Sequence, residues 1–318
     1  MSLSIVFMGT PEFAVPTLIE LNKKYNVKAV VTATDKPQGR GHKVLPSPVK
    51  KTALELDLLV LQPDKLNNTD FIETLKTINP DIIVVVAFRI LPKEVFTIPH
   101  LGCFNIHASL LPKYRGAAPI NWAIINGEKI TGLTSFLIKE KVDTGNILLQ
   151  TVIPIPEGAT AGDLHDLMAP LAARLAIDTC ELLAKGNFKP IPQDESLATS
   201  APKIFSHNAK INFDDYAELV RNFIHGYSPV PGAWTIFEDK KMKIFRADYE
   251  KCNCSVNDVF LGLEKPGEFL IEKGLFCVKC KTGFIFIKEL QIEGKKITNV
   301  TDFINGYKGE KKGCFNNF

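Results

Sequence analysis

The first strand-forming stretch of the sequence is Ser4-Ile5-Val6-Phe7-Met8, and it leads through Gly9-Thr10-Pro11 into a helical pattern that ends near Lys23. A short, continuously apolar run of this kind is typical of a strand buried on both faces of a parallel sheet. Further strand-like runs follow at 27–34, 58–62, 81–87 and 102–107, with helical stretches at 48–56, 69–78 and 118–125. This alternation predicts an α/β fold with a mostly parallel sheet and a ligand site off the carboxyl ends of its strands.

The second half of the chain changes its pattern. Two more strands are expected at 131–138 and 147–155, and Thr160 with Asp163 forms a capping box for a helix that ends near Lys185. Residues 190–206 are rich in Pro, Ser, Ala and Lys and are interpreted as a linker. Beyond a helix that ends near Gly226, short strands at close spacing predict a small β-barrel or sandwich. We therefore expect three parts, at 1–189, 190–206 and 207–318.

Composition and charge narrow the class of protein. The chain has 318 residues, 45% of them apolar and 23% charged, and a formal net charge of +3. These values exclude a supercharged nucleic-acid coat and an acidic disordered chain, but not a local basic patch. No apolar run is long enough for a membrane span, and the first residues lack the features of a signal peptide. We expect a cytoplasmic protein without a membrane partner, and a monomer.

The seven cysteines give a second constraint. Without a secretion signal, disulfides are not expected. Cys252-x-Cys254 and Cys277-x-x-Cys280 have spacings that zinc sites use, so a structural metal is one interpretation. The second pair lies in an apolar stretch that we expect to form a hairpin turning at Thr282-Gly283, which favours buried or edge thiols. We therefore expect no metal.

Nucleotide-binding motifs are absent from the sequence. Gly9 is the only glycine of the first strand–helix turn, where a dinucleotide fingerprint requires three, and no Walker lysine motif occurs. A nicotinamide or nucleotide enzyme is therefore disfavoured.

Asn105 and His107 are the first candidate site residues. They lie two apart at the end of a predicted strand, so both side chains are expected on one face of the sheet. One amide and one imidazole could converge there on a developing oxyanion. The alternative is that backbone groups satisfy both side chains. Asp143, in Val142-Asp143-Thr144-Gly145-Asn146, is by itself typical of a turn.

Several motifs in order resemble a known family. Asn105-x-His107 is followed by Ser109-Leu110-Leu111-Pro112-Lys113-Tyr114-Arg115-Gly116, then by Gly132-x-Thr134 and by Asp143-Thr144-Gly145. This series resembles the 10-formyltetrahydrofolate-dependent formyltransferases. Within that family, 6–14, 35–50, 211–213 and 228–234 resemble the branch that acts on initiator methionyl-tRNA.

The resemblance implies a fold and a set of roles. The fold would be a Rossmann-like catalytic domain followed by a small, OB-like β-barrel that binds tRNA. The catalytic residues would be Asn105 and His107 as donors to the oxyanion, with Asp143 orienting His107 or accepting a proton. The co-substrate would be 10-formyltetrahydrofolate, bound along Ser109, Leu110, Leu111 and Pro112, although these residues could also form only a tight apolar loop.

One segment departs from the family pattern. Ala87-Phe88-Arg89-Ile90-Leu91-Pro92 is one residue shorter than usual and lacks a glycine. It is similar to the corresponding stretch of glycinamide ribonucleotide formyltransferases. The resemblance implies folate contacts from Phe88, Arg89 and Ile90, whose details the departure affects.

A basic segment is the candidate RNA contact. Residues 35–51 carry five Lys or Arg side chains and one Asp, which gives a local charge of +4. The pattern alone allows a solvated loop, but the resemblance implies that Lys36, Arg40, His42 and Lys43 contact the tRNA. Two alternatives stay open. They are a formyltransferase for a nucleotide-linked amino sugar, and a non-catalytic RNA-binding module on the same scaffold.

Overall fold

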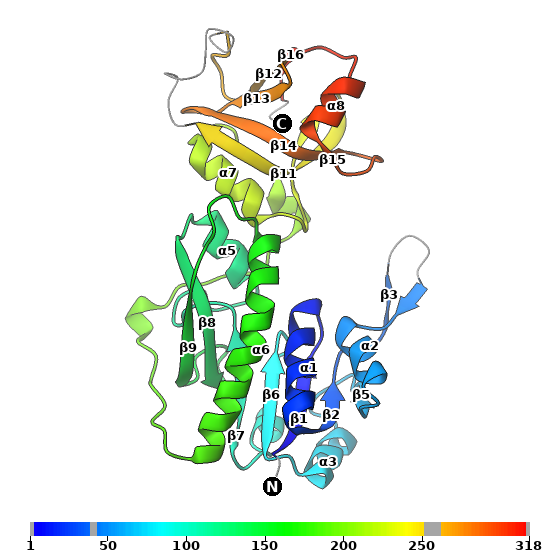
Figure 1. Cartoon of the computed structure of the whole chain (residues 1–318), viewed down its shortest axis with the longest axis vertical. Coiled ribbons are helices and arrows are strands. Elements are labelled where there is room, and N and C mark those ends of the chain that lie inside the picture. The colour runs from blue at the N-terminus through cyan, green and yellow to red at the C-terminus, as the bar shows by residue number, and fades with distance from the viewer. Residues whose placement is uncertain (1–2, 39–42, 251–261, 316–318) are drawn as a thin grey trace. The chain divides into compact units, whose positions relative to one another are not determined.

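The computed structural model describes residues 3–38, 43–250 and 262–315 and contains two compact units (Figure 1). Unit 1 comprises Met1–Pro119, Ile130–Pro154 and His165–Ala201, and unit 2 comprises Ile120–Lys129, Ile155–Leu164 and Pro202–Phe318. The chain thus passes between the units several times. The predicted division into 1–189, 190–206 and 207–318 stays a prediction. Residues 190–201 of the predicted linker belong to unit 1.

Unit 1 is built on a seven-stranded sheet with the order β5-β2-β1-β6-β7-β8-β9. The pairs from β5 to β7 are parallel, and β8 and β9 are antiparallel. This arrangement confirms the mostly parallel α/β sheet. The strands are β1 (Ser4–Gly9), β2 (Asn26–Val31), β5 (Val60–Leu61), β6 (Ile82–Val86), β7 (Gly102–His107), β8 (Ile130–Leu137) and β9 (Ile147–Pro154).

Helices cover both faces of this sheet. Phe71 of α3 and Val95 of α4 pack in one cluster with Met8 and Val85, which point from the sheet to that face. On β8, the Ser135 hydroxyl accepts a hydrogen bond from Thr179 of α6 at 2.8 Å. The helices are α1 (Val15–Lys24), α2 (Pro48–Glu55), α3 (Thr69–Ile78), α4 (Lys93–Phe96) and α6 (Ala161–Lys185), and a 3-10 turn, Glu12–Ala14, precedes α1.

Side-chain caps explain why the predicted helices begin where they do. Asn68 Oδ1 accepts the Asp70 N–H at 2.8 Å at the start of α3, and Ser47 Oγ accepts the Lys50 N–H at 3.0 Å at the start of α2. At the start of α6, Thr160 and Asp163 bond reciprocally, and the Thr160 N–H donates to Asp163 Oδ2 at 2.9 Å. Each cap satisfies amide groups that have no partner within the helix.

Unit 2 is a curled antiparallel sheet with helices against it. Its strand path is β10-β11-β14-β13-β12-β16, with β15 paired to β14. The rings of Phe269, Phe276 and Phe315 surround Phe237 in the core. This curled sheet confirms the small β-domain predicted from the short strands. The elements are α5 (Pro119–Ile125), α7 (Ala217–Gly226), β10 (Ala233–Phe237), β11 (Lys240–Glu250), β12 (Glu268–Glu272), β13 (Leu275–Lys279), β14 (Phe284–Ile292), β15 (Thr298–Asn299), α8 (Val300–Gly306) and β16 (Lys312–Cys314), with 3-10 turns at Glu195–Leu197 in unit 1 and Ser206–Ala209 in unit 2.

The basic segment of the sequence forms a separate two-stranded sheet. Its strands β3 (Lys36–Gln38) and β4 (Lys43–Leu45) pair antiparallel, with Lys36 opposite Leu45.

Across the parts of the chain that the structure describes, no helix is both long enough and apolar enough to cross a membrane.

Candidate active site

His107 is the last residue of β7 and lies at the carboxyl end of that strand. The residue is 6% exposed, and its Nε2 lies 2.7 Å from the Tyr114 carbonyl oxygen. Because a carbonyl can only accept, we assign a proton to Nε2 and leave the Nδ1 edge facing the site. Asn105 lies two residues earlier on the same strand and is partly buried. Both residues lie in β7, and the period of the strand places their side chains on one face.

Asp143 reaches His107 from the connection between β8 and β9. Its Oδ2 lies 3.8 Å from His107 Nδ1 and accepts the Gly116 N–H at 2.9 Å. A separation of 3.8 Å is too long for a hydrogen bond. The ring of His107 is therefore oriented by the Tyr114 carbonyl, while Gly116 holds the carboxylate. The Asp143 side chain is 12% exposed, and its φ of 54° is uncommon for a residue with a side chain.

The loop Ser109-Leu110-Leu111-Pro112 is fixed by Thr134 of β8. The Thr134 hydroxyl donates to the Ser109 carbonyl at 2.7 Å and accepts the Leu111 N–H at 3.1 Å. Gln150 on β9 donates to the Leu111 carbonyl at 3.0 Å and to Thr134 at 2.9 Å. These backbone groups are therefore bonded within the protein. A ligand along the loop would meet the second lone pairs of the carbonyls and the partly exposed Leu110 and Pro112.

Gly132 explains the spacing of Gly132-x-Thr134. A Cβ at this position would lie 2.3 Å from the Thr151 carbonyl oxygen and 2.4 Å from Leu110 Cδ2. A side chain there would collide with β9 and push Leu110 away. The glycine thus makes room for the loop that Thr134 holds.

Arg89 has partners that the sequence did not indicate. Its guanidinium donates to the carbonyls of Pro63 at 2.8 Å and Asp64 at 2.9 Å, and it lies over the Phe88 ring at 5.3 Å from the centroid. The neighbouring Ile90 is 71% exposed. Arg89 thus ties its own segment to residues 63–64, and folate contacts from Phe88, Arg89 and Ile90 stay a prediction.

One cation of the basic segment, Lys50, is paired with a carboxylate of the same segment. Lys50 Nζ lies 2.5 Å from Asp35 Oδ2, and Gln62 donates to Asp35 Oδ1 at 2.9 Å. These two hydrogen bonds, that from Lys50 first, lower the pKa of Asp35. Arg40 and His42 lie outside the described residues, and for Lys36 and Lys43 only the backbone is described. The predicted tRNA contacts of these four residues stay a prediction.

The structure describes some of the cysteines of unit 2. Cys277 and Cys280 are buried free thiols, and burial raises the pKa of each to about 12. Within residues 3–38, 43–250 and 262–315, no group of three or more His, Cys, Asp or Glu side chains could hold a metal ion. Cys252 and Cys254 lie outside those residues.

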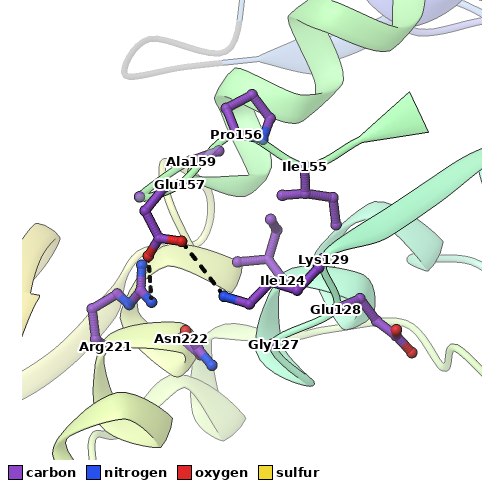
Figure 2. A pocket seen from close by; sticks show the side chains of 11 residues that line it. Ile124, Gly127, Glu128, Lys129, Ile155, Pro156, Glu157, Ala159, Arg221 and Asn222 are labelled. Atoms are coloured by element: carbon purple, nitrogen blue, oxygen red, sulfur yellow. Dashed lines mark hydrogen bonds and ion pairs between the residues drawn. The ribbon is translucent and has the colours of Figure 1, made fainter. Parts of the chain in front are cut away.

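A cavity in unit 2 was not predicted from the sequence. Its volume is about 30 Å³, and Arg221 and Asn222 of α7 line it together with Glu157 and Lys129 (Figure 2). Glu157 pairs with both cations, at 3.4 Å from Arg221 and 3.5 Å from Lys129. A drug-sized ligand needs several hundred Å³, so this cavity is too small for a pterin.

Sequence reasoning missed several polar residues that hold the candidate site. Thr134 belongs to the Gly132-x-Thr134 motif, but the sequence alone gave it no role. Gln150, Arg115 and Gln193 carried no assigned role, and Gln193 lies in the segment interpreted as a linker. Asn105 and His107 at the end of β7 and Asp143 after β8 gave a usable signal in the sequence, whereas nothing local marks Gln193.

A mostly parallel α/β unit that places an imidazole and a carboxylate near the end of one strand fits a group-transfer enzyme. The chain belongs to the formyl transferase family. The model of formyl transferase matches residues 3–179, and that of the formyl transferase C-terminal domain matches 203–308.

Full-length relatives are similar to this chain. It is 43% identical to the methionyl-tRNA formyltransferase of Ruminiclostridium cellulolyticum over 98% of this chain and 100% of the relative. It is 46% identical to that of Azobacteroides pseudotrichonymphae over 95% of each. A solved sugar 3N-formyl transferase is 23% identical, with a TM-score of 0.65 over 93% of this chain and 100% of that one. At this identity the solved structure supports the fold alone.

Proposed function

We propose that this chain transfers the formyl group of 10-formyltetrahydrofolate to the α-amino group of methionine on initiator methionyl-tRNA. The observation that carries the proposal is the 43–46% identity with methionyl-tRNA formyltransferases, which extends over 95–98% of the chain. The likeness thus includes the C-terminal residues as well as the candidate active site. A protein with this acceptor would work in the cytoplasm, and we expect it to act as a monomer.

The candidate site supplies what this reaction needs. A free α-amino group has a pKa of about 7.7–8.0, so part of it is a neutral nucleophile at pH 7. Attack on the formyl carbon forms a tetrahedral oxyanion, to which the Asn105 amide would donate. His107 would donate to it from Nδ1 when its ring carries a second proton, because Nε2–H is bonded to the Tyr114 carbonyl. Asp143 would accept the proton from the attacking nitrogen, directly or through a water molecule. Collapse of the oxyanion then breaks the bond to the folate nitrogen, which takes up a proton.

The loop 109–112 supports the donor side of the proposal. Thr134 and Gln150 hold its backbone, so the loop is shaped before a ligand arrives. A preformed apolar wall with few polar groups is suited to a flat ring system. We propose that the pterin and its linked ring lie along Leu110 and Pro112, beside the ends of β7 and β8.

The basic segment supports the acceptor side. Once Lys50 is paired with Asp35, the cations left on the segment before α2 are Lys36, Arg40 and Lys43. Such side chains can contact phosphates without reading sequence. We propose that this segment contacts the tRNA and that unit 2 adds further phosphate contacts, which would leave the chemistry to unit 1.

An acceptor comparison tests the proposal. The purified chain is mixed with 10-formyltetrahydrofolate and, in separate reactions, with methionyl-initiator tRNA, a charged elongator tRNA and a dTDP-linked amino sugar. We expect rapid formylation of the initiator methionyl-tRNA and little reaction with the other two. Preferential formylation of the amino sugar would favour the alternative activity, and no transfer to any acceptor would favour a non-catalytic RNA-binding module.

A further inference from the structure

The loop that carries Asp143 is held by a side chain distant in sequence. Gln193 Nε2 donates to two carbonyl oxygens of this loop, that of Asp143 at 2.9 Å and that of Gly145 at 2.8 Å. We infer that Gln193 is a positioning residue for formyl transfer and acts by holding the backbone of Asp143. This inference rests on the role of Asp143 in the proposed function.

The direction of the Gln193 amide is fixed by its partners. Its Oε1 accepts from Arg115 Nε at 3.1 Å and from a terminal nitrogen of the same guanidinium at 2.7 Å. Carbonyls only accept and guanidinium groups only donate, so the amide nitrogen must face the loop and the oxygen must face Arg115. The glutamine amide supplies both the donor and the acceptor that this arrangement needs, whereas glutamate would turn a second acceptor toward the two carbonyls.

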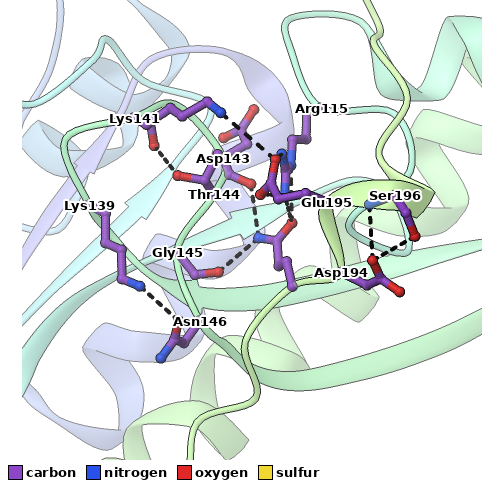
Figure 3. A network of polar contacts seen from close by, with 11 residues as sticks. Arg115, Lys139, Lys141, Asp143, Thr144, Gly145, Asn146, Asp194, Glu195 and Ser196 are labelled. Atoms are coloured by element: carbon purple, nitrogen blue, oxygen red, sulfur yellow. Dashed lines mark hydrogen bonds and ion pairs between the residues drawn. The ribbon is translucent and has the colours of Figure 1, made fainter.

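Arg115 is itself anchored on two sides. Its guanidinium also binds Glu195 with two hydrogen bonds, at 2.8 and 2.9 Å, and Figure 3 shows Arg115 and Glu195 facing each other beside Asp143 and Gly145. Its backbone pairs with the segment after Glu195, where the Arg115 N–H donates to the Thr199 carbonyl at 2.9 Å. The acceptor that Gln193 presents is therefore met by a guanidinium that Glu195 also binds.

The segment 193–201 contacts the surroundings of Asp143 at two places. Gln193 holds the main chain of Asp143, and Gly116, which holds the carboxylate, is packed against Ala201. A Cβ on Gly116 would lie 2.6 Å from the Ala201 carbonyl oxygen. Asp143 also has a φ of 54°, in the left-handed region that aspartate adopts more readily than most residues with a side chain. The composition of 190–206 indicated a linker, whereas residues 193–201 contact the candidate site on both sides.

Gln193→Glu isolates the contact with the loop. This variant keeps an oxygen for Arg115 but removes the donor to the Asp143 and Gly145 carbonyls. Because a displacement of about 1 Å can cost about a hundredfold in rate, we expect kcat to fall by about 10- to 100-fold. We expect KM for the folate and for the tRNA to stay at the wild-type values, and the melting temperature to stay within about 4 °C of wild type. Gln193→Met, which removes both contacts, should lose at least as much.

The matched control is Asp194→Asn. Asp194 is the exposed neighbour of Gln193 and bonds to Ser196, and Asn keeps an oxygen for that bond. This variant should keep the wild-type kcat. A wild-type kcat in Gln193→Glu would overturn the inference. A loss of kcat with equal rises in both KM values and a lower melting temperature would also overturn it, because that pattern indicates a general structural role.

Asp143→Asn, assayed in parallel, separates this inference from the proposed function. If Asp143→Asn is inactive while Gln193→Glu turns over like wild type, the inference fails and the proposed chemistry stands. If Asp143→Asn itself turns over like wild type, the proposed chemistry fails, whatever the result at Gln193.

Discussion

The Nδ1 atom of His107 lies 3.8 Å from Oδ2 of Asp143, and each side chain has a different fixed partner. The Tyr114 carbonyl binds the far side of the imidazole, and the Gly116 N–H binds the carboxylate. The two groups therefore face each other without bonding directly. A substrate atom beside them can contact both, which suits a step in which one group accepts a proton while charge develops nearby.

Thr134→Val tests whether Thr134 holds the loop 109–112. Valine keeps the shape of the side chain but removes the bonds to Ser109, Leu111 and Gln150, and it leaves buried backbone groups unpaired. We expect the free energy of unfolding to fall by about 1–3 kcal/mol, measured by urea denaturation, and KM for the folate to rise several-fold. Thr151→Val on the adjacent strand β9 is the control. Unchanged stability and folate KM in Thr134→Val would show that the loop is held in another way.

Arg40→Ala tests the role of the basic segment in tRNA binding. We expect kcat/KM for initiator methionyl-tRNA to fall while KM for the folate stays the same. Loss of one phosphate contact should also reduce the slope of log affinity against log salt by about 1. Lys51→Ala is the control, since Lys51 is 71% exposed on α2 and lies 4.0 Å from Glu55. Equal losses for tRNA and folate in Arg40→Ala would instead indicate a structural segment.

His225 gives unit 2 a dependence on pH. The side chain is buried, and its Nε2 accepts the Ala247 N–H at 3.1 Å, which requires that nitrogen to be unprotonated. Burial, with the charges of Arg221 and Arg246, lowers the pKa of His225 to about 4. The unfolded chain then binds a proton at a higher pH than the folded chain. The contribution of His225 to the free energy of unfolding is therefore fully present above about pH 6.5 and is lost as the pH falls toward 4.

Urea denaturation between pH 7.5 and pH 4 measures this effect. We expect His225→Gln to be less stable at pH 7.5 and to lose less stability than the wild type as the pH falls. His207→Gln, which changes an exposed histidine, should follow the wild type. Parallel pH curves for the wild type and His225→Gln would contradict the assignment.

The sequence predicted most elements of the fold because local signals mark them. The strand Gly102–His107 and the helix Thr69–Ile78 lie where the pattern placed them, and Asn68 supplies the cap that the helix needs. The contacts of the site were harder to predict because they join distant segments. Asp143 is 36 residues from His107 in the sequence, and Gln193 is 50 residues from Asp143. Composition marked residues 190–206 as irregular, but it could not show what they contact.

Arg89 is a single residue whose contacts could not be predicted from the sequence. A guanidinium in a segment that resembles a folate site looks available to a ligand, yet its donors bind the carbonyls of Pro63 and Asp64. Backbone carbonyls leave no trace in the sequence as partners, because every residue has one. Thr134 could have been assigned a role, since a buried hydroxyl must find partners.

The most direct test of Asp143 as the proton acceptor is the single-turnover rate of formyl transfer by Asp143→Asn with both substrates bound. Asparagine keeps an oxygen for the Gly116 N–H but is not a base. Since a positioned general base contributes about 10²- to 10⁴-fold, we predict a rate at least about a hundredfold below wild type. We also predict unchanged binding of 10-formyltetrahydrofolate and methionyl-tRNA. A rate close to wild type in the folded variant would contradict the account.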